Sequence, residues 1–204
     1  MIKLEKINLT LRQQSIFTNL NLHIIKNKKI LLKMPSGTGK STLLKVIMGY
    51  IPIDSGNIII DKEVLGENNI DVLRQKFAYI SQNISFTEES VEKYIELIFS
   101  FKKNKNIKLS NSNLYDLLEK FELDKNILKK SPLLLSGGEK QRIALILVLL
   151  LDRDILLLDE VTSGLDHDLK IKVIKIIKNL NKTVIISSHD NQWLDHDEFE
   201  IVRW

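Results

Sequence analysis

Apolar and polar residues alternate along the first part of the chain. The alternation covers residues 7–11 and returns over residues 20–24, where every second side chain is Leu or Ile. This pattern is typical of strands that have one face on the core and the other in water. We expect these two segments to form antiparallel strands at the start of the fold.

Later short runs are apolar at consecutive positions instead. Strands covered on both faces, as in a parallel sheet between layers of helices, have this pattern. Helical segments separate the runs, so we expect a parallel sheet. Its predicted strands include Ile30 to Leu32, Ile58 to Ile60, Ile155 to Leu158 and Val184 to Ile186.

The apolar period changes between about residues 85 and 135. Apolar residues recur at the i, i+3, i+4, i+7 spacing of one helix face over residues 91–98 and again over residues 114–121. The lysine-rich link at 102–108 is expected to be a solvated loop. We therefore expect one domain, residues 1–204, with a core at about 1–84 and 136–204 and an inserted helical subdomain at about 85–135.

Composition and charge narrow the classes of protein. Of the 204 residues, 44% are hydrophobic and 27% are charged, which excludes a disordered chain, a coiled coil and a collagen-like chain. The net charge of +4 is too mild to require nucleic acid as a partner. The absence of cysteine excludes disulfides and a thiolate nucleophile. The longest apolar run, Ile143 to Leu151, is shorter than the roughly 20 residues that span a bilayer, and no signal-like segment opens the sequence.

A glycine-rich segment, MPSGTGKST at residues 34–42, links a predicted strand to an apolar helical segment. At such a junction, backbone N–H groups at a helix N-terminus bind phosphate. Gly37 and Gly39 let the backbone approach phosphate oxygens, Lys40 neutralises the β- and γ-phosphate charges, and the Ser41 hydroxyl can bind Mg²⁺. The predicted nucleotide-binding residues of this loop are Ser36, Gly37, Thr38, Gly39, Lys40, Ser41 and Thr42.

Two adjacent carboxylates, Asp159 and Glu160, end another apolar run. Neighbouring residues of a strand point to opposite sides, so the two cannot do the same job. We expect one to hold Mg²⁺ and its waters and the other to polarise an attacking water, although alone the pattern fits an acidic turn equally well. A histidine, His189, follows the last apolar run, and such a residue taken alone is more often structural.

A third motif, LSGGEKQR at residues 135–142, precedes a long apolar helical segment. Ser136 and Glu139 have the spacing of a capping box, so a purely structural helix start explains both. Gly137 and Gly138 are harder to explain in that way. They place bare backbone N–H groups beside a hydroxyl at the positive end of a helix, which favours an anion.

Together these motifs resemble those of the ATP-binding cassette (ABC) ATPases. The phosphate loop, Gln82, LSGGEKQR, the Asp159-Glu160 pair, the segment Ser163-Gly-Leu-Asp166 and His189 follow in the order and approximate spacing of that family, over essentially the whole chain. LSGGEKQR is the most specific element, because other P-loop NTPases lack it. The resemblance implies an α/β fold: a P-loop NTPase (RecA-like) core with a mixed parallel sheet, an N-terminal antiparallel β subdomain and an inserted α-helical subdomain.

The resemblance also implies roles for single residues in ATP hydrolysis. Glu160 matches the catalytic base of the family, and His189 matches the residue that holds the γ-phosphate and the attacking water. Lys40 contacts the phosphates. Asp159 and Gln82 match the Mg²⁺ shell, together with the hydroxyl of Ser41.

A head-to-tail homodimer with two ATP molecules between its subunits is implied as well. Ser136, Gly137 and Gly138 would close on the γ-phosphate that the other copy binds. Asp166 matches the loop that reaches across the dimer. Neither subunit would then be complete alone.

Four positions depart from the family pattern. Met34 replaces the first glycine of the phosphate loop, at a cost of about 1 kcal/mol if the position needs a positive φ. The aromatic residue on which the family stacks adenine falls at Leu11, with Phe17 as the nearest substitute, so these two are the candidate contacts of the base. Asn27 replaces a turn glycine, which is mild because asparagine tolerates the left-handed region. Gly164 stands where alanine is commoner.

The function implied is that of the ATP-hydrolysing subunit of a transporter, working through a separate transmembrane permease. Such a subunit is cytoplasmic and peripheral on the inner face of the cell membrane. Aromatic residues of the segment 85–101 are candidate contacts with the permease. The transported substance is not readable; resemblance to compact exporter-type cassettes slightly favours export, with a metal ion as the cargo.

Two other functions compete with this one. An ABC ATPase acting on ribosomes or DNA is expected to carry two cassettes or a long coiled coil, and no basic aromatic platform for nucleic acid stands out. A nucleotide-sensing regulator with impaired catalysis is kept open by Met34 and Leu11, while Glu160 and His189 argue against it.

Overall fold

A computed structural model describes all of residues 1–204. The predicted antiparallel start is confirmed, because β1 (Ile2–Leu11) pairs with β2 (Gln14–Ile24). β4 (Ser55–Ile60) and β5 (Glu63–Val64) extend this sheet in the order β2-β1-β4-β5, with antiparallel neighbours throughout. We call it sheet A.

The prediction for Ile58 to Ile60 is wrong. These residues form the end of β4 in sheet A, antiparallel to β1, and not a strand of the parallel sheet. Ile58 and Ile60 are buried on one face, while Ile59 lies on the other and is only half-buried. A run of three apolar residues is too short to distinguish a strand covered on one face from a strand covered on both.

The second sheet, sheet B, is entirely parallel. Its strands are β6 (Phe77–Ile80), β7 (Ile155–Asp159), β8 (Thr183–Ser187), β3 (Lys29–Leu32) and β9 (Phe199–Val202), in that spatial order. The other three predicted strands are confirmed as β3, β7 and β8. The register brings the carboxyl ends of these three strands to one edge, where open α/β sheets bind ligands.

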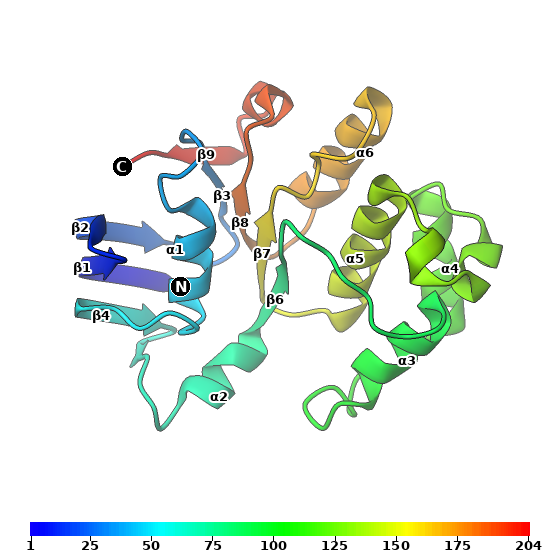
Figure 1. The fold of residues 1–204 in the computed structure, drawn as a ribbon, viewed down its shortest axis with the longest axis horizontal. Helices are drawn as coiled ribbons and strands as arrows, with labels where there is room; N and C mark the ends of the chain where they lie inside the picture. The colour runs from blue at the N-terminus through cyan, green and yellow to red at the C-terminus, as the bar shows by residue number, and fades with distance from the viewer.

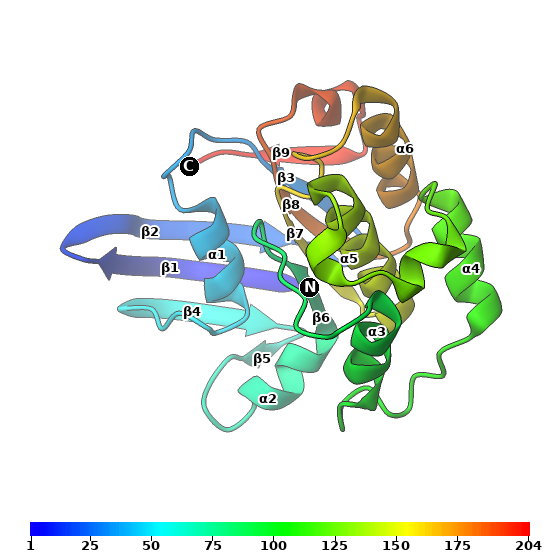
Figure 2. The same ribbon diagram turned by 45° about the vertical axis from the view of Figure 1, so that its right-hand side comes forward.

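Helices cover both faces of sheet B. Figure 1 shows α1 (Lys40–Ile47) between sheet A and sheet B, with α5 (Gly137–Leu151) and α6 (His167–Lys178) on the opposite side, and Figure 2 agrees. Side chains of β7 alternate accordingly. Leu157 packs in the same apolar cluster as α1 and sheet A, whereas Leu156 packs with α5 and α6. Burial on both faces explains the unbroken apolar runs.

The segment predicted as an inserted subdomain is helical. α3 (Val91–Ser100) and α4 (Asn111–Lys120) are capped by the hydroxyls of Ser90 and Ser110, and both pack against the cluster that holds α5. The link between them is mostly exposed, but Asn104 is buried and donates to the carbonyl oxygen of Ile98 at 2.7 Å.

Short turns join the longer elements. They are α2 (Ile70–Leu73) and the 3₁₀ turns Arg74–Lys76, Lys125–Lys129, Pro132–Leu134 and Asn191–Asp195. None of the helices combines the length and apolar character needed to cross a lipid bilayer.

Candidate functional site

The glycine-rich segment forms the loop between β3 and α1, at the carboxyl edge of sheet B. Gly37 and Gly39 have φ angles of 82° and 95°, which other residues rarely adopt, and a Cβ on Gly39 would lie 2.7 Å from Ile16. The loop itself therefore requires both glycines. α1 begins at Lys40 without a side-chain cap, so its first N–H groups remain for an anion.

The departures at Met34 and Asn27 are harmless to the backbone. Met34 has no positive φ, so the strain considered for it does not arise. Its side chain is 6% exposed and packs in the core with α1. Asn27 has a φ of 63°, in the left-handed region that asparagine tolerates, as expected.

The ammonium group of Lys40 is fixed inside the loop. Its Nζ donates to the carbonyl oxygens of Met34 at 2.7 Å and Pro35 at 3.1 Å and lies 3.0 Å from Nε2 of His189. Burial lowers the pKa of Lys40, although the carboxylates of Glu160 and Asp159 counteract part of this effect. These contacts are with uncharged acceptors, which leaves the positive charge for an anionic ligand.

Asp159 is the last residue of β7 and Glu160 follows it, so the alternation of side chains along a strand, on which the prediction relied, does not extend to Glu160. Glu160 has a φ of 54°, and its N–H donates to the carbonyl oxygen of Ser187 at 2.8 Å, so its side chain leaves the strand direction. Its Oε2 accepts from the N–H of His189 at 3.4 Å. Burial raises the pKa of the Glu160 carboxyl, and His189 and Lys40 offset only part of the rise. A raised pKa suits a general base.

Three buried oxygens at this edge have no hydrogen-bond partner. They are Oδ1 of Asp159, Oε1 of Glu160 and Oγ of Ser187. Buried oxygens are rarely left unpaired in folded proteins. Oxygen donors of this kind, two of them carboxylates, fit a hydrated divalent cation such as Mg²⁺ beside the loop.

One cavity of about 320 Å³ brings most of the predicted residues together. Its lining includes the loop, Gln82, Glu160 and His189, and His189 Nε2 lies 3.2 Å from the hydroxyl of Ser36. Gln82 is exposed and follows β6. The predicted residues in the lining are Ser36, Gly37, Gly39, Lys40, Ser41, Thr42, Gln82, Glu160 and His189.

The LSGGEKQR segment does not line this cavity. Ser136 and Glu139 form the predicted capping box at the start of α5. Gly138 is needed by the fold, because a Cβ there would lie 2.9 Å from the carbonyl oxygen of Gly164, whereas Gly137 has open space around it and no positive φ. Asp166 is also away from the cavity and caps α6 by accepting from the N–H of Leu169 at 2.9 Å.

The two residues predicted to contact the adenine base do not form an accessible aromatic surface. Leu11 is half-buried at the end of β1, and Phe17 is only 3% exposed. The accessible ring at this place is Trp204, which packs edge-on against Phe17 with ring centroids 5.8 Å apart and donates from Nε1 to the carbonyl oxygen of Thr38 at 3.3 Å. Sequence reasoning missed Trp204, because no motif connects it to the loop.

Gln141, inside the LSGGEKQR segment, is a second residue that the sequence did not single out. Its Nε2 donates to the carbonyl oxygen of Glu160 at 3.3 Å and to the hydroxyl of Ser163 at 3.0 Å. Its Oε1 accepts from the N–H of Gly164 at 3.0 Å. This side chain joins α5 to the end of β7, which gives the segment a role within its own subunit.

This geometry can bind a phosphate chain next to a buried carboxylate with a raised pKa. Comparisons with known proteins point to the same chemistry. The family model described as "ABC transporter" matches residues 17–163. The chain is 32% identical to the probable iron export ATP-binding protein FetA of Escherichia coli (strain K12), covering 96% of this chain and 88% of that protein.

Two further comparisons extend this result. The chain is 32% identical to the zinc import ATP-binding protein ZnuC of Histophilus somni (strain 129Pt), covering 99% of this chain and 72% of that protein. Among solved structures, the dimer of MJ0796, a bacterial ABC transporter cassette, matches with a TM-score of 0.81 at 27% identity over 95% of this chain and 90% of that one. That cassette is also known as a dimer in a post-hydrolysis state bound to ADP and Pi. The chain belongs to the ABC family and is an ATP-hydrolysing, ATP-binding subunit of the transporter type.

Proposed function

We propose that the cavity between the phosphate loop and β7 hydrolyses ATP with Glu160 as the base. The observation that carries the proposal is the convergence of Lys40, Glu160 and His189 on one cavity, with Nζ of Lys40 3.0 Å from Nε2 of His189 and Glu160 hydrogen-bonded to the N–H of His189. The loop amides and Lys40 bind the triphosphate. Glu160 takes a proton from the attacking water, and His189 holds that water and the γ-phosphate in line.

Mg²⁺ would be held by Ser41, Gln82 and Asp159. When bound, the ion neutralises charge that develops on the phosphate oxygens. The unpaired Oδ1 of Asp159 supports this assignment, because a buried carboxylate oxygen needs a partner.

Replacing the base tests the assignment of Glu160. Glu160→Gln should keep ATP binding and slow turnover by about 10²- to 10⁴-fold, the usual contribution of a positioned base. Equilibrium binding of a fluorescent ATP analogue and steady-state phosphate release measure the two effects separately. A variant that hydrolyses ATP at the parent rate would assign the base elsewhere.

A head-to-tail homodimer is the second part of the proposal. Gly137 supports it, because nothing in its own subunit requires a glycine there, and glycine within a helix costs about 1 kcal/mol relative to alanine. Ser136 and Gly137 are both exposed. The capping box uses the N–H groups of Ser136 and Glu139, which leaves the exposed backbone of Gly137 for a phosphate that is bound by another copy.

Mixing two inactive variants tests the dimer. Lys40→Met disables the phosphate loop and Ser136→Arg blocks the surface offered to the partner, so neither variant should hydrolyse ATP alone. A mixed dimer contains one site with both parts intact, so a one-to-one mixture should recover up to about a quarter of the parent activity if dimers form at random. Ser136→Arg should still bind ATP as a monomer. Hydrolysis by Ser136→Arg alone, or no recovery on mixing, would contradict the shared site.

A transmembrane permease is the third part. An apolar cavity of about 200 Å³ lies between the helical subdomain and sheet B, and ten of its thirteen lining residues are hydrophobic. Phe86 and Tyr94 line it and pack edge-on, with ring centroids 4.7 Å apart. Phe101 is exposed and lies outside the lining. Four lining residues, 83–86, directly follow Gln82 in the sequence, and Gln82 lines the nucleotide cavity. A segment bound in the apolar cavity would therefore be coupled to the nucleotide site.

Phe86→Ser and Phe101→Ser form a matched pair for this docking site. Phe86→Ser should release the subunit from native membranes without loss of its ATP binding, whereas Phe101→Ser should stay bound. Purification from native membranes followed by identification of the co-purified protein tests the partner and the location at the inner face of the cell membrane. Recovery of ribosomes or nucleic acid instead would favour the competing class of soluble ABC ATPases.

Export of a metal ion is the transport activity we favour. The resemblance to compact exporter-type cassettes and the similarity to FetA, named for iron export, support it, while ZnuC is named for import. The permease selects the cargo, so uptake and efflux of radioactive metal ions by vesicles holding the complete transporter test both direction and cargo.

A further inference from the structure

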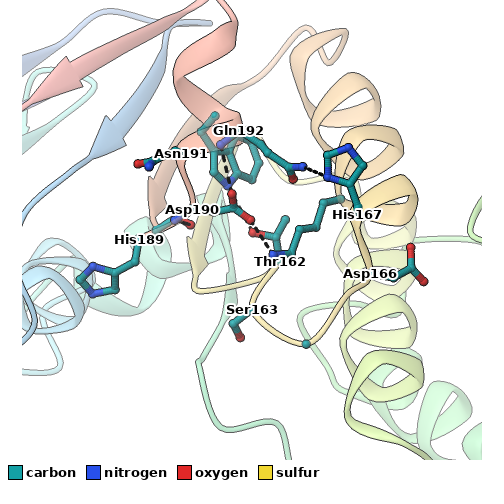
Figure 3. A network of polar contacts seen from close by, with 12 residues as sticks. Thr162, Ser163, Asp166, His167, His189, Asp190, Asn191 and Gln192 are labelled. Atoms are coloured by element: carbon teal, nitrogen blue, oxygen red, sulfur yellow. Dashed lines mark hydrogen bonds and ion pairs between the residues drawn. The ribbon is translucent and has the colours of Figure 1, made fainter.

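Two loops beside the ATP site are connected outside the cavity through the residues that flank them (Figure 3). One is the segment 163–166, which precedes α6, and the other is the segment 189–192, which follows β8. We call them the 163–166 loop and the 189–192 loop. The contacts join residues 190–193 to Thr162, directly before the 163–166 loop, and to His167 and Lys170 of α6, after it. The proposed hydrolysis assigns these side chains no role.

His189 and Asp190 point in opposite directions. His189 reaches the hydroxyl of Ser36 and Nζ of Lys40 in the cavity, whereas Asp190 points toward α6, as Figure 3 shows. The backbone of Asp190 is extended, with φ −70° and ψ 127°, and successive side chains on extended backbone project to opposite sides. Whatever fixes Asp190 therefore also sets the direction from which His189 enters the cavity.

Lys170 of α6 fixes Asp190. Its Nζ lies 2.9 Å from Oδ2 of Asp190, and the side chains of the two residues are 25% and 15% exposed. Burial alone would raise the pKa of the Asp190 carboxyl. The N–H of Gln192, which donates to Oδ1 at 3.0 Å, and the ammonium of Lys170 outweigh it and hold the pKa below its usual value. A partly buried charge pair is screened less by salt than an exposed one.

Further contacts hold the 189–192 loop and Trp193 against residues on either side of the 163–166 loop. The side chain of Gln192 contacts Nδ1 of His167 at the start of α6. The fully buried indole of Trp193 donates from Nε1 to the hydroxyl of Thr162 at 3.3 Å. On the other side, Nζ of Lys33 donates to the carbonyl oxygen of His189 at 2.6 Å. The 189–192 loop is thus held between β3 and α6.

The first turn of α6 transmits this connection to the 163–166 loop. Asp166 caps α6, and its carbonyl oxygen accepts from the N–H of Lys170 at 3.0 Å. A displacement of Asp166 therefore moves Lys170, and the ion pair passes that movement to Asp190 and the direction of His189.

We propose that Lys170 is a positioning residue for ATP hydrolysis: its ion pair with Asp190 makes the orientation of His189 depend on the position of the 163–166 loop. The proposal rests on the role assigned to His189 above. The ion pair thereby connects the 163–166 loop, which precedes α6, to the catalytic centre of the same subunit. ATP binding itself does not need the ion pair, because neither Lys170 nor Asp190 lines the cavity.

Neutral variants of the pair test the proposal. Lys170→Met and Asp190→Asn should each lower kcat by about 2- to 30-fold, the effect that corresponds to the coupling energies of such connections. The Kd for ATP should stay within about 2-fold of the parent value. The double variant should be no slower than the slower single variant, because both changes break one interaction. Lys170→Arg keeps the charge and should restore most of kcat.

A matched control lies on the same helix. Lys178 pairs with Glu198 at 2.7 Å, and its side chain is 30% exposed, close to the value for Lys170. Lys178→Met removes a lysine of similar exposure from the other end of α6, where its partner Glu198 is 44% exposed, and should leave kcat unchanged.

Several outcomes would overturn the proposal. The ion pair does not position His189 if Lys170→Met keeps the parent kcat or if the losses in the double variant are additive. The same conclusion follows if arginine does not rescue kcat or if Lys178→Met loses as much activity as Lys170→Met. His189→Ala separates this failure from that of the proposed function. Parent-like hydrolysis in His189→Ala contradicts the role of the histidine itself, whereas a slow His189→Ala beside a normal Lys170→Met contradicts only the positioning by Lys170.

Discussion

Gly138 lies so close to Gly164 that a Cβ on Gly138 would be 2.9 Å from the carbonyl oxygen of Gly164. This contact packs the start of α5 against the 163–166 loop. Gly137, one residue earlier, has nothing within 4 Å of its Cβ position apart from its chain neighbours and the backbone of its own helix. The two neighbouring glycines therefore have different reasons to be glycine.

Alanine substitutions should separate these reasons. Gly138→Ala should lower the free energy of unfolding by about 1–3 kcal/mol, as overpacking of a close contact does. Gly137→Ala should have the same free energy of unfolding as the parent protein, or one up to about 1 kcal/mol higher, because alanine favours a helix. Gly137→Ala should nevertheless hydrolyse ATP poorly, since in the proposed dimer its added methyl group would face the partner copy. Denaturant unfolding and phosphate release measure the two properties, and an active Gly137→Ala would remove the support that this residue gives to the dimer.

The pH dependence of stability should reveal the buried carboxyl of Glu160. Burial raises its pKa above the ordinary value of 4.5, so the unfolded chain ionises more readily than the folded one. The favourable contribution of the Glu160 carboxyl to the free energy of unfolding is complete below about pH 4.5 and is lost as the pH rises through the raised pKa. Glu160→Gln should therefore melt at a higher temperature than the parent at about pH 8, and the difference should vanish near pH 4.

Glu139 supplies a control of opposite sign. The N–H of Ser136 and the ammonium of Lys130 hold the pKa of Glu139 below its usual value, although burial acts in the other direction. Its contribution is present above the ordinary pKa and is lost as the pH falls through the lowered value. Glu139→Gln should melt below the parent at about pH 8, with a difference that shrinks in acid. Parallel shifts in both variants would show that the burial of Glu160 is not the cause.

Gln141 should matter for stability within one subunit. Gln141→Ala leaves the N–H of Gly164 and the carbonyl oxygen of Glu160 without this partner, and a lost hydrogen bond at a buried group costs about 1–3 kcal/mol. Gln141→Glu keeps the acceptor for Gly164 and loses the donor, so it should fall between the parent and Gln141→Ala. Thermal unfolding of the three proteins gives the order. Equal stability of all three would mean that water replaces the side chain.

The sequence predicted those parts of the site that local chemistry determines. The phosphate loop follows from glycines with positive φ between a strand and a helix, and the order of apolar runs places Asp159 and His189 at the same sheet edge. The sheet to which Ile58 to Ile60 belong could not be predicted, because that depends on pairing with Leu4 and Ile2, more than fifty positions away. The same holds for Lys170 and Asp190, whose contact depends on how α6 packs beside β8.

Trp204 should report nucleotide binding by fluorescence. The chain has two tryptophans, and Trp193 is fully buried while Trp204 is 38% exposed beside the phosphate loop. The indole of Trp204 donates to Thr38 and lies against Phe17, so a change in the loop on ATP binding alters the surroundings of this ring. We expect ATP to change the emission of the parent protein and not that of Trp204→Phe, while Trp193→Phe keeps the response. If the signal persisted in Trp204→Phe, the emission change would come from Trp193 and the 189–192 loop instead. Stacking of a base on an aromatic ring contributes roughly 1–3 kcal/mol. If Trp204→Phe also bound ATP more weakly by this amount, Trp204 would be the residue that stacks on adenine, the role that the sequence assigned to Leu11 and Phe17.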